Sequence, residues 1–352
     1  QLRLKVEPEM TGEPCNYGIS LFEKLVVNAQ IQSASCLFTL SVQRRMHPQI
    51  SELIRKVFYS DGKEQINDAK STNTLGNPYG IPHRVRFFMH NYEENKIATR
   101  SHVNIQEAKF CASLVPFFIC RGYKPEDITI ISLYKGQMFQ IQREIDALFS
   151  KYQNNRGESQ LFKPFGNIKY SRQIKVVVLD NFQGEENKVI IVSLTRSDKP
   201  GFVKNRNRAL VTLSRAREML VVLGNERVFG MSCKKNDQWK KISTVASQLS
   251  PFSMSKPDEQ GIAVNKCGIH KPNSKDIPSF LQTPQQVYDY RFSFCKELCN
   301  FKLPCTHLCQ LKCHCHSYPP GPNEHDDYYC PFPCLKRCEK GHQCPRTCGE
   351  CT

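Results

Sequence analysis

Residues 176–225 read VVVLDNFQGEENKVIIVSLTRSDKPGFVKNRNRALVTLSRAREMLVVLGN, and this stretch decides the fold. Two apolar runs frame an Asp-x-Phe-Gln-Gly-x-Glu turn, and a third follows a segment that carries Ser-Arg-Ala-Arg. From about residue 36 to 230, short apolar runs alternate with segments of helical periodicity. This alternation predicts an α/β domain in which helices cover both faces of a parallel sheet.

Polar and charged side chains stand at the ends of these predicted strands, where sheets of this kind place ligand chemistry. They are Asp180, Gln183, Glu186, Arg215 and Arg217. Carboxylate, amide and paired guanidinium groups suit a nucleoside triphosphate better than an apolar metabolite. The stretch therefore predicts a nucleotide site.

Outward from this stretch, the periodicity predicts further elements. Helices are expected at 20–30, 47–59, 104–118 and 136–149, and strands at 36–40, 85–90 and 128–134. The polar, basic residues 151–172 predict an insertion loop. CASLVPFFIC at 111–120 is the longest apolar stretch; it is shorter than the roughly 18 residues of a membrane span, so we expect a buried helix face there.

The last 58 residues contain 12 of the 18 cysteines. The unit His-x-Cys-x3-Cys occurs at His307 and again at His342. Thiolates with imidazoles in short loops favour tetrahedral zinc. A disulfide framework of a secreted domain is the alternative, but disulfides need no histidines. The predicted ligands are Cys295, Cys299, Cys305, His307, Cys309, Cys313, His314, Cys315, His316, Cys330, Cys334, Cys338, His342, Cys344, Cys348 and Cys351. Their grouping stays open, because spacing permits many partitions.

Several motifs resemble superfamily-one helicases of the branch that contains the nonsense-mediated-decay helicase and senataxin. LSVQRRMHPQI at 40–50 resembles the Gln-Tyr-Arg-Met-His-Pro motif, and ITIISLYKGQ at 128–137 resembles the strand that ends in Tyr-x-x-Gln. The opening stretch resembles the fifth and sixth motifs. Gln1-Leu2-Arg3 is similar to the end of the Gly-Asp-x-x-Gln-Leu motif that closes the first motor domain. With the cysteine-rich tail, the chain resembles the NFX-type zinc-finger-containing helicases.

The resemblance implies a domain plan. Residues 1–30 would end the first motor lobe and add a connecting helix, and 31–235 would form a RecA-like second lobe. Residues 236–290 lack clear periodicity and contain several Pro and Ser residues, which predicts an irregular linker. Residues 291–352 would form an irregular, zinc-stabilised array.

The resemblance also implies roles for single residues. Arg45 and Arg215 match arginines that reach the γ-phosphate of ATP from the second lobe, and Gln1 matches the glutamine that senses that phosphate and orients water. Glu186 matches the residue that binds the ribose. Asp180 and Gln183, with the adjacent Gly184, would couple nucleotide state to the nucleic-acid path. Tyr134 is expected either to pack in the core or to stack on a base.

The sequence departs from the motifs at a few positions. Arg44 replaces the tyrosine expected to stack on adenine, and a guanidinium can still stack on a ring. Val178 and Leu210 replace a hydroxyl residue and an asparagine. No Gly-x4-Gly-Lys-Ser/Thr loop and no Asp-Glu strand end occur in the chain, so it holds half of a catalytic site. We expect the first lobe, with the Mg²⁺ ligands, to precede residue 1, and we expect this chain alone to be inactive.

The formal charge of +16 and the pI near 9.1 favour a polyanionic partner. The resemblance implies that this partner is single-stranded RNA and that the zinc array can bind protein partners as well. It also implies a role in RNA surveillance, antiviral defence or small-RNA silencing. The implied location is the cytoplasm, with the nucleus as a second compartment. A non-enzymatic zinc- and RNA-binding scaffold is the alternative function. A RING-like ubiquitin ligase is the third.

Overall fold

The computed structural model describes residues 21–31, 38, 40–60, 66–74, 81, 83–96, 101–119, 123–154, 168–198, 201–229, 238–249, 262–263, 280–289, 298, 301–310, 330–337 and 339–351. Some of the predicted site residues lie outside these ranges: Gln1, Cys295, Cys299, Cys313, His314, Cys315, His316 and Cys338.

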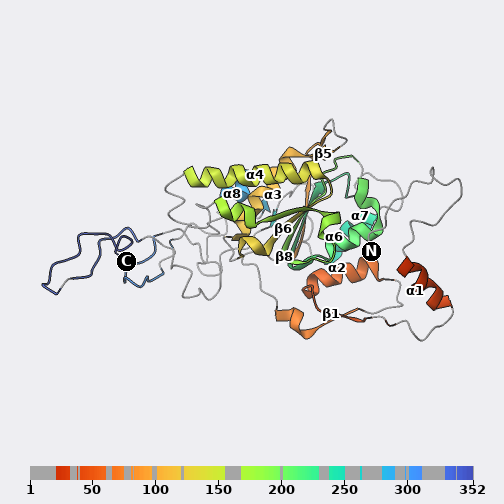
Figure 1. Cartoon of the computed structure of the whole chain (residues 1–352), viewed down its shortest axis with the longest axis horizontal. Coiled ribbons are helices and arrows are strands. Elements are labelled where there is room, and N and C mark those ends of the chain that lie inside the picture. Colours follow the sequence, from red (N-terminus) through yellow and green to blue (C-terminus); the bar gives the residue numbers. More distant parts are fainter. Residues whose placement is uncertain are drawn as a thin grey trace.

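A five-stranded sheet forms the centre of the lobe (Figure 1). Its strands are β3 (Val85–His90), β6 (Ile128–Ser132), β7 (Lys175–Val178), β8 (Asn187–Ser193) and β9 (Ala216–Asn225). They lie in the order β3-β9-β8-β6-β7, and every pairing is parallel. The structure thus confirms the predicted α/β class with a parallel sheet.

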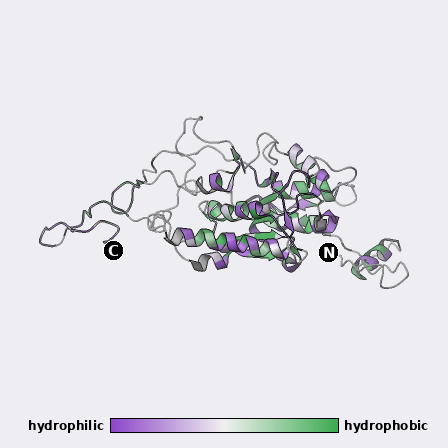
Figure 2. Ribbon diagram, turned by 90° about the horizontal axis from the view of Figure 1, so that it is seen from above, coloured by the Kyte–Doolittle hydropathy of each residue, from purple (hydrophilic) through white to green (hydrophobic). Residues whose placement is uncertain are grey.

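Helices cover both faces of this sheet (Figure 1). One face carries α3 (Ile105–Ile119), α4 (Lys135–Asn154) and the short α8 (Pro284–Asp289), and the other carries α2 (Pro48–Phe58), α6 (Arg206–Leu213) and α7 (Gln238–Leu249). Strand β8 supplies both cores, because successive residues of a strand point to opposite faces. Ile191 joins the cluster on the α3 face and Ile190 the cluster on the α2 face. Figure 2 shows the hydrophobic residues concentrated within this layered body.

Two helices follow their predicted local signals. Helix α2 begins after His47, whose side chain accepts a hydrogen bond from the N–H of Gln49, with Pro48 at the first helical position. Helix α3 is buried on nearly all sides, which confirms the prediction for residues 111–119. None of the described helices combines the length and apolarity that a membrane crossing needs.

The remaining elements are short or lie apart from the sheet. Helix α1 (Leu21–Ile31) lies where a helix was predicted, and it exposes Leu21 and Phe22. Three two-stranded pairs are β1 (Val42–Gln43) with β2 (Asn67–Asp68), β4 (Asn95–Lys96) with β5 (His102–Val103), and β10 (Ile262–Ala263) with β11 (Phe280–Leu281). The 3₁₀ helices are η2 (Lys70–Thr74), η3 (Pro125–Asp127), η5 (Ile168–Gln173), η6 (Leu179–Phe182) and η7 (Gly201–Lys204).

The structure corrects three predictions. The insertion loop expected at 151–172 is helical at both ends, since α4 continues to Asn154 and η5 begins at Ile168. Part of the expected linker at 236–290 is helical: α7 buries Trp239, Ile242 and Ala246 in the lobe, and α8 packs on α3. The three side chains share one helix face, so they have an apolar surface to bury against α2 and the sheet. The strand expected at 36–40 is also wrong for its described residues, since Phe38 and Leu40 are exposed and lie in no strand.

Candidate functional site

Residues predicted to contact nucleotide meet at the amino ends of β8 and β9. Glu186 immediately precedes β8, and Arg215 immediately precedes β9. The backbone of Asn187 donates to the carbonyl of Arg215 at 3.2 Å, which holds these two positions side by side. The loop before α2 joins them, because the N–H of His47 donates to the carbonyl of Arg217 at 2.8 Å. Three segments far apart in sequence therefore build one cluster.

A glutamine that sequence reasoning gave no role directs Arg45 into this cluster. The side-chain oxygen of Gln43 accepts the N–H groups of Arg45 at 3.0 Å and Met46 at 2.8 Å. Its amide nitrogen donates to the carbonyl of Met46 at 2.8 Å and to the Asp68 carboxylate at 2.7 Å. These hydrogen bonds fix the conformation of the turn from Gln43 to Met46, and this turn positions the side chain of Arg45. Its signal in the sequence was the first letter of Gln-Arg-Arg-Met-His-Pro.

Arg45 contacts the single carboxylate of the cluster. Its Nε donates to Glu186, and its Nη1 donates to the carbonyl of Ser214 at 3.2 Å. The Nε of Arg217 lies 3.8 Å from the other oxygen of Glu186. The side chains of Arg45 and Glu186 are about one-third exposed, at 34% and 36%, so the pair is open to solvent and to an incoming ligand.

Arg215 is held more deeply. Only 9% of the residue is exposed, and its Nε and Nη1 donate to the carbonyls of Val211 and Glu185, both at 3.0 Å. Burial, and then the charge of Arg45, lower the pKa of Arg215, while Glu186 opposes the shift. Three guanidiniums face one carboxylate here, so positive charge is in excess. The cluster suits an anion.

The other predicted nucleotide residues differ in position. Asp180 lies in η6 and pairs with Arg208 at 3.3 Å, so the structure does not bring it to Arg45. Gln183 and Gly184 form the exposed turn that leads to Glu186, and Gly184 has φ +84°, which favours glycine. Arg44 is exposed and adjoins Arg45.

The Tyr-x-x-Gln motif lies at the opposite, carboxyl edge and serves packing. Tyr134 is 6% exposed within the α2-side core, so it packs rather than stacks on a base. Gln137 donates to Ser193 at 3.0 Å, and Ser193 in turn donates to Glu107 at 2.5 Å. Glu107 also contacts His90 at 2.7 Å. Sequence reasoning missed this buried network; its signal was an acidic residue inside an almost wholly apolar helix.

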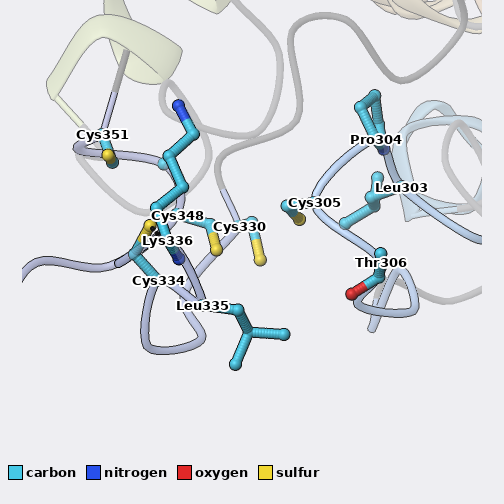
Figure 3. Close-up of a pocket in the computed structure, with 11 residues that line it drawn as sticks. Leu303, Pro304, Cys305, Thr306, Cys330, Cys334, Leu335, Lys336, Cys348 and Cys351 are labelled. Atoms are coloured by element: carbon cyan, nitrogen blue, oxygen red, sulfur yellow. Dashed lines mark hydrogen bonds between the residues drawn. The ribbon is translucent and has the colours of Figure 1, made fainter. Parts of the chain in front are cut away.

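Two groups of potential metal ligands lie in the tail. The first comprises Cys305, His307, Cys330 and Cys348, and the second comprises Cys334, Cys344 and Cys351. Within each group all ligand atoms lie within 4.8 Å of one another. Figure 3 shows Cys305 on one loop facing Cys330 and Cys348 on another. The eight described cysteines are not joined in disulfides.

The spacing of these atoms fits zinc. A tetrahedral ion with bonds of about 2.3 Å to sulfur separates its ligand atoms by roughly 3.8 Å. Nδ1 of His307 lies 3.6 Å from the sulfur of Cys330 and 3.5 Å from that of Cys348, and the sulfurs of Cys344 and Cys351 lie 3.9 Å apart. Burial and neighbouring thiols raise the pKa of Cys348 to about 12, so metal binding there must release a proton.

Two predicted ligands lie in neither group. Cys309 is fully buried, and His342 is exposed. The repeat His-x-Cys-x3-Cys is divided as well, since Cys344 belongs to the second group and Cys348 to the first. The repeat is therefore not the unit that gathers ligands among the described residues.

The chain is similar to known proteins over most of its length. The family model described as an AAA domain matches residues 17–227. The chain is 30% identical to NFX1-type zinc finger-containing protein 1 of Mus musculus, over 99% of this chain and 16% of that protein. It is 33% identical to "Helicase required for RNAi-mediated heterochromatin assembly 1" of Schizosaccharomyces pombe, over 79% of this chain and 24% of that protein. It is 32% identical to the Regulator of nonsense transcripts 1 homolog of Drosophila melanogaster, over 63% of this chain and 17% of that protein.

Proposed function

We propose that this chain, which belongs to the AAA-domain family of superfamily-one helicases, supplies the second motor lobe of an ATP-dependent RNA helicase or RNA–protein remodeller. The observation that supports this most is the meeting of Arg45, Arg215 and Glu186 at one edge of the sheet. The chain covers a minor part of its relatives' length, so the activity belongs to a longer protein in which another lobe supplies the phosphate loop and the Mg²⁺ ligands.

In this proposal the arginines complete the site when the two lobes close. Guanidiniums stabilise the charge that develops on a transferred phosphoryl group. In this proposal Arg45 exchanges Glu186 for a phosphate oxygen, and Arg215 donates to the phosphate from Nη2, because its Nε and Nη1 already donate to carbonyls. Glu186, once released, is free to accept a ribose hydroxyl. Gln1, through its motif, would orient the attacking water.

The test is turnover of ATP by the full-length protein in the presence of RNA. We expect Arg215→Ala to lower turnover by about three to five orders of magnitude, the scale of a lost arginine finger, and Arg45→Ala to have a comparable or smaller effect. Arg227→Ala is the matched control, because Arg227 is an exposed arginine that pairs with Glu93 away from the cluster. Unchanged turnover in both test variants would rule out the roles proposed for these two arginines.

The second part of the proposal concerns RNA, for which the excess of basic residues is the support. We expect single-stranded RNA to bind with little sequence preference, since motor channels follow the backbone and stacked bases. Affinity should fall steeply with salt, with a log–log slope of roughly −0.7 for each phosphate neutralised. Fluorescence anisotropy between 50 and 200 mM salt measures the slope. Tight binding that ignores salt argues against this partner.

The third part is that the tail binds zinc through the two cysteine groups and adds contacts to RNA or protein separate from the motor. The fit of the ligand spacing supports zinc. A role in RNA surveillance or small-RNA silencing belongs to this proposal too, and it is supported by similarity to a regulator of nonsense transcripts and to a helicase required for RNAi-mediated heterochromatin assembly. An antiviral role, and a place in the cytoplasm with the nucleus as a second compartment, rest on the resemblance of the motifs alone.

A further inference from the structure

We infer that the tail holds its zinc ions through interleaved ligands, so that one ion ties residues 301–310 to residues 330–351. The inference rests on the zinc binding proposed above and deepens it. The two ligand groups are not consecutive in the chain. Cys330 belongs to the first group, Cys334 and Cys344 to the second, Cys348 to the first again, and Cys351 to the second.

The first site spans the two sequence repeats. Cys305 and His307 come from the loop 301–310, which carries the first repeat, and Cys330 and Cys348 come from 330–351, which carries the second. Nδ1 of His307 lies at 3.6 Å and 3.5 Å from the two sulfurs of the other segment, within the range that a shared tetrahedral ion requires. Three thiolates and one imidazole therefore converge from two loops.

Backbone hydrogen bonds within residues 330–351 explain why ligands of the two groups alternate along this segment. The N–H of Cys348 donates to the carbonyl of Phe332 at 2.8 Å, and the N–H of Gly349 donates to that of Cys330 at 2.9 Å. These bonds bring Cys330 and Cys348 to one end of the segment. The N–H of Cys344 donates to the carbonyl of Lys336 at 2.9 Å, which brings Cys344 to the level of Cys334 at the other end.

Packing between the two loops supports the same arrangement. The ring of His307 stacks on Phe332 with centroids 5.1 Å apart. Leu303 and Cys309 of the first loop form a small buried cluster with Cys330 of the second. A cavity of about 690 Å³ lies between them, bordered by Pro304 on one side and Leu335 and Lys336 on the other (Figure 3). Cys305, Cys330 and Cys348 also line this cavity, so it includes the position of the first ligand group and opens between both loops.

Counting bound zinc in paired variants of the full chain separates interleaved sites from sites built one per repeat. Interleaving predicts that Cys305→Ala and Cys348→Ala each lose one ion and that their double variant still loses only one. It also predicts that the double variant Cys344→Ala with Cys348→Ala loses two. Sites built one per repeat predict the reverse: two ions lost from the first pair and one from the second. Native mass spectrometry gives the counts.

A second measurement uses the unaltered protein, in case a variant fails to fold. Zinc is withdrawn with increasing chelator, and the thiols that become open to alkylation are mapped by mass spectrometry. Cys305, Cys330 and Cys348 should lose protection together, and Cys334, Cys344 and Cys351 should lose it together in a separate step. Joint loss of Cys344 with Cys348 would overturn the interleaving while leaving zinc binding intact. Absence of bound zinc would instead remove the zinc part of the proposed function.

Discussion

In the lobe, two clusters of buried hydrophobic side chains pack on the two faces of a five-stranded sheet, whereas the described tail buries only Leu303, Cys309, Cys330 and Cys334 among its apolar and thiol side chains. The lobe therefore gains its stability by removing apolar surface from water. The tail has too little such surface, and a small segment of this kind needs metal or disulfides. The same chain thus uses two sources of stability, and each can be removed separately.

Removal of zinc should have the largest effect. We expect chelation at neutral pH to unfold residues 301–310 and 330–351 of the tail, since metal affinity in such a segment is folding free energy. The thermal transition of the lobe should stay nearly unchanged. Hydrogen exchange of the tail and calorimetry of the lobe, recorded on one sample, measure both responses. If the tail stays folded after chelation and its thiols are oxidised, disulfides stabilise it in place of zinc. The contrast drawn here between the lobe and the tail would then be wrong.

A cavity made in the lobe should come next in size. Trp239→Ala removes a fully buried ring that contacts Phe229, so we expect it to lower the free energy of unfolding by about 3–5 kcal/mol and to leave zinc content unchanged. Urea denaturation measures the change. Lys241→Ala, an exposed change on the same helix, is the control and should stay within roughly 0.5 kcal/mol. Equal effects of both changes would mean that α7 is not part of the lobe's core.

The smallest and sharpest test uses two glycines with the same geometry. Gly184 in the lobe has φ +84° and Gly341 in the tail has φ +83°, and a Cβ built at either meets nothing within 4 Å. Replacement by alanine should therefore cost only backbone strain, about 1 kcal/mol at each position. Gly184→Ala should lower the stability of the lobe to urea. Gly341→Ala should instead weaken zinc affinity about fivefold, measured by competition with a chelating dye. If Gly341→Ala lowers the stability of the protein to urea but leaves zinc affinity unchanged, the lobe and the tail do not have separate sources of stability.

Much of the lobe follows from local signals. The His-Pro start of α2 and the apolar runs of β6 and β8 predicted elements that the structure contains, because their apolar side chains alone determine which faces are buried. Helix α7 was missed, since most of the residues that separate Trp239, Ile242 and Ala246 are polar, two lysines, a serine and a threonine, and they weaken the periodic pattern. Only the surface of α2 and the sheet reveals that this face has a partner.

The residues of the candidate sites were also predictable only in part. The motif arginines and Glu186 were predicted and do meet, while Asp180 pairs elsewhere. The roles of Gln43 and Glu107 could not be read from sequence, because each depends on hydrogen bonds to distant segments. In the tail the spacing left the grouping of the ligands open, and the fold of the loops divides the second His-x-Cys-x3-Cys repeat between two groups.

The order of the strands has a consequence for how this protein emerges from the ribosome. β9 lies between β3 and β8, yet it is the last of the five to be synthesised. At 5–20 residues per second, β3 waits roughly 6–25 s after its own completion before β9 begins to appear. During that interval the segment that carries the apolar Phe87 and Phe88 lacks the strand with which it finally pairs. A nascent chain stalled before residue 216 should therefore present them to chaperones, and release of the stall should withdraw them.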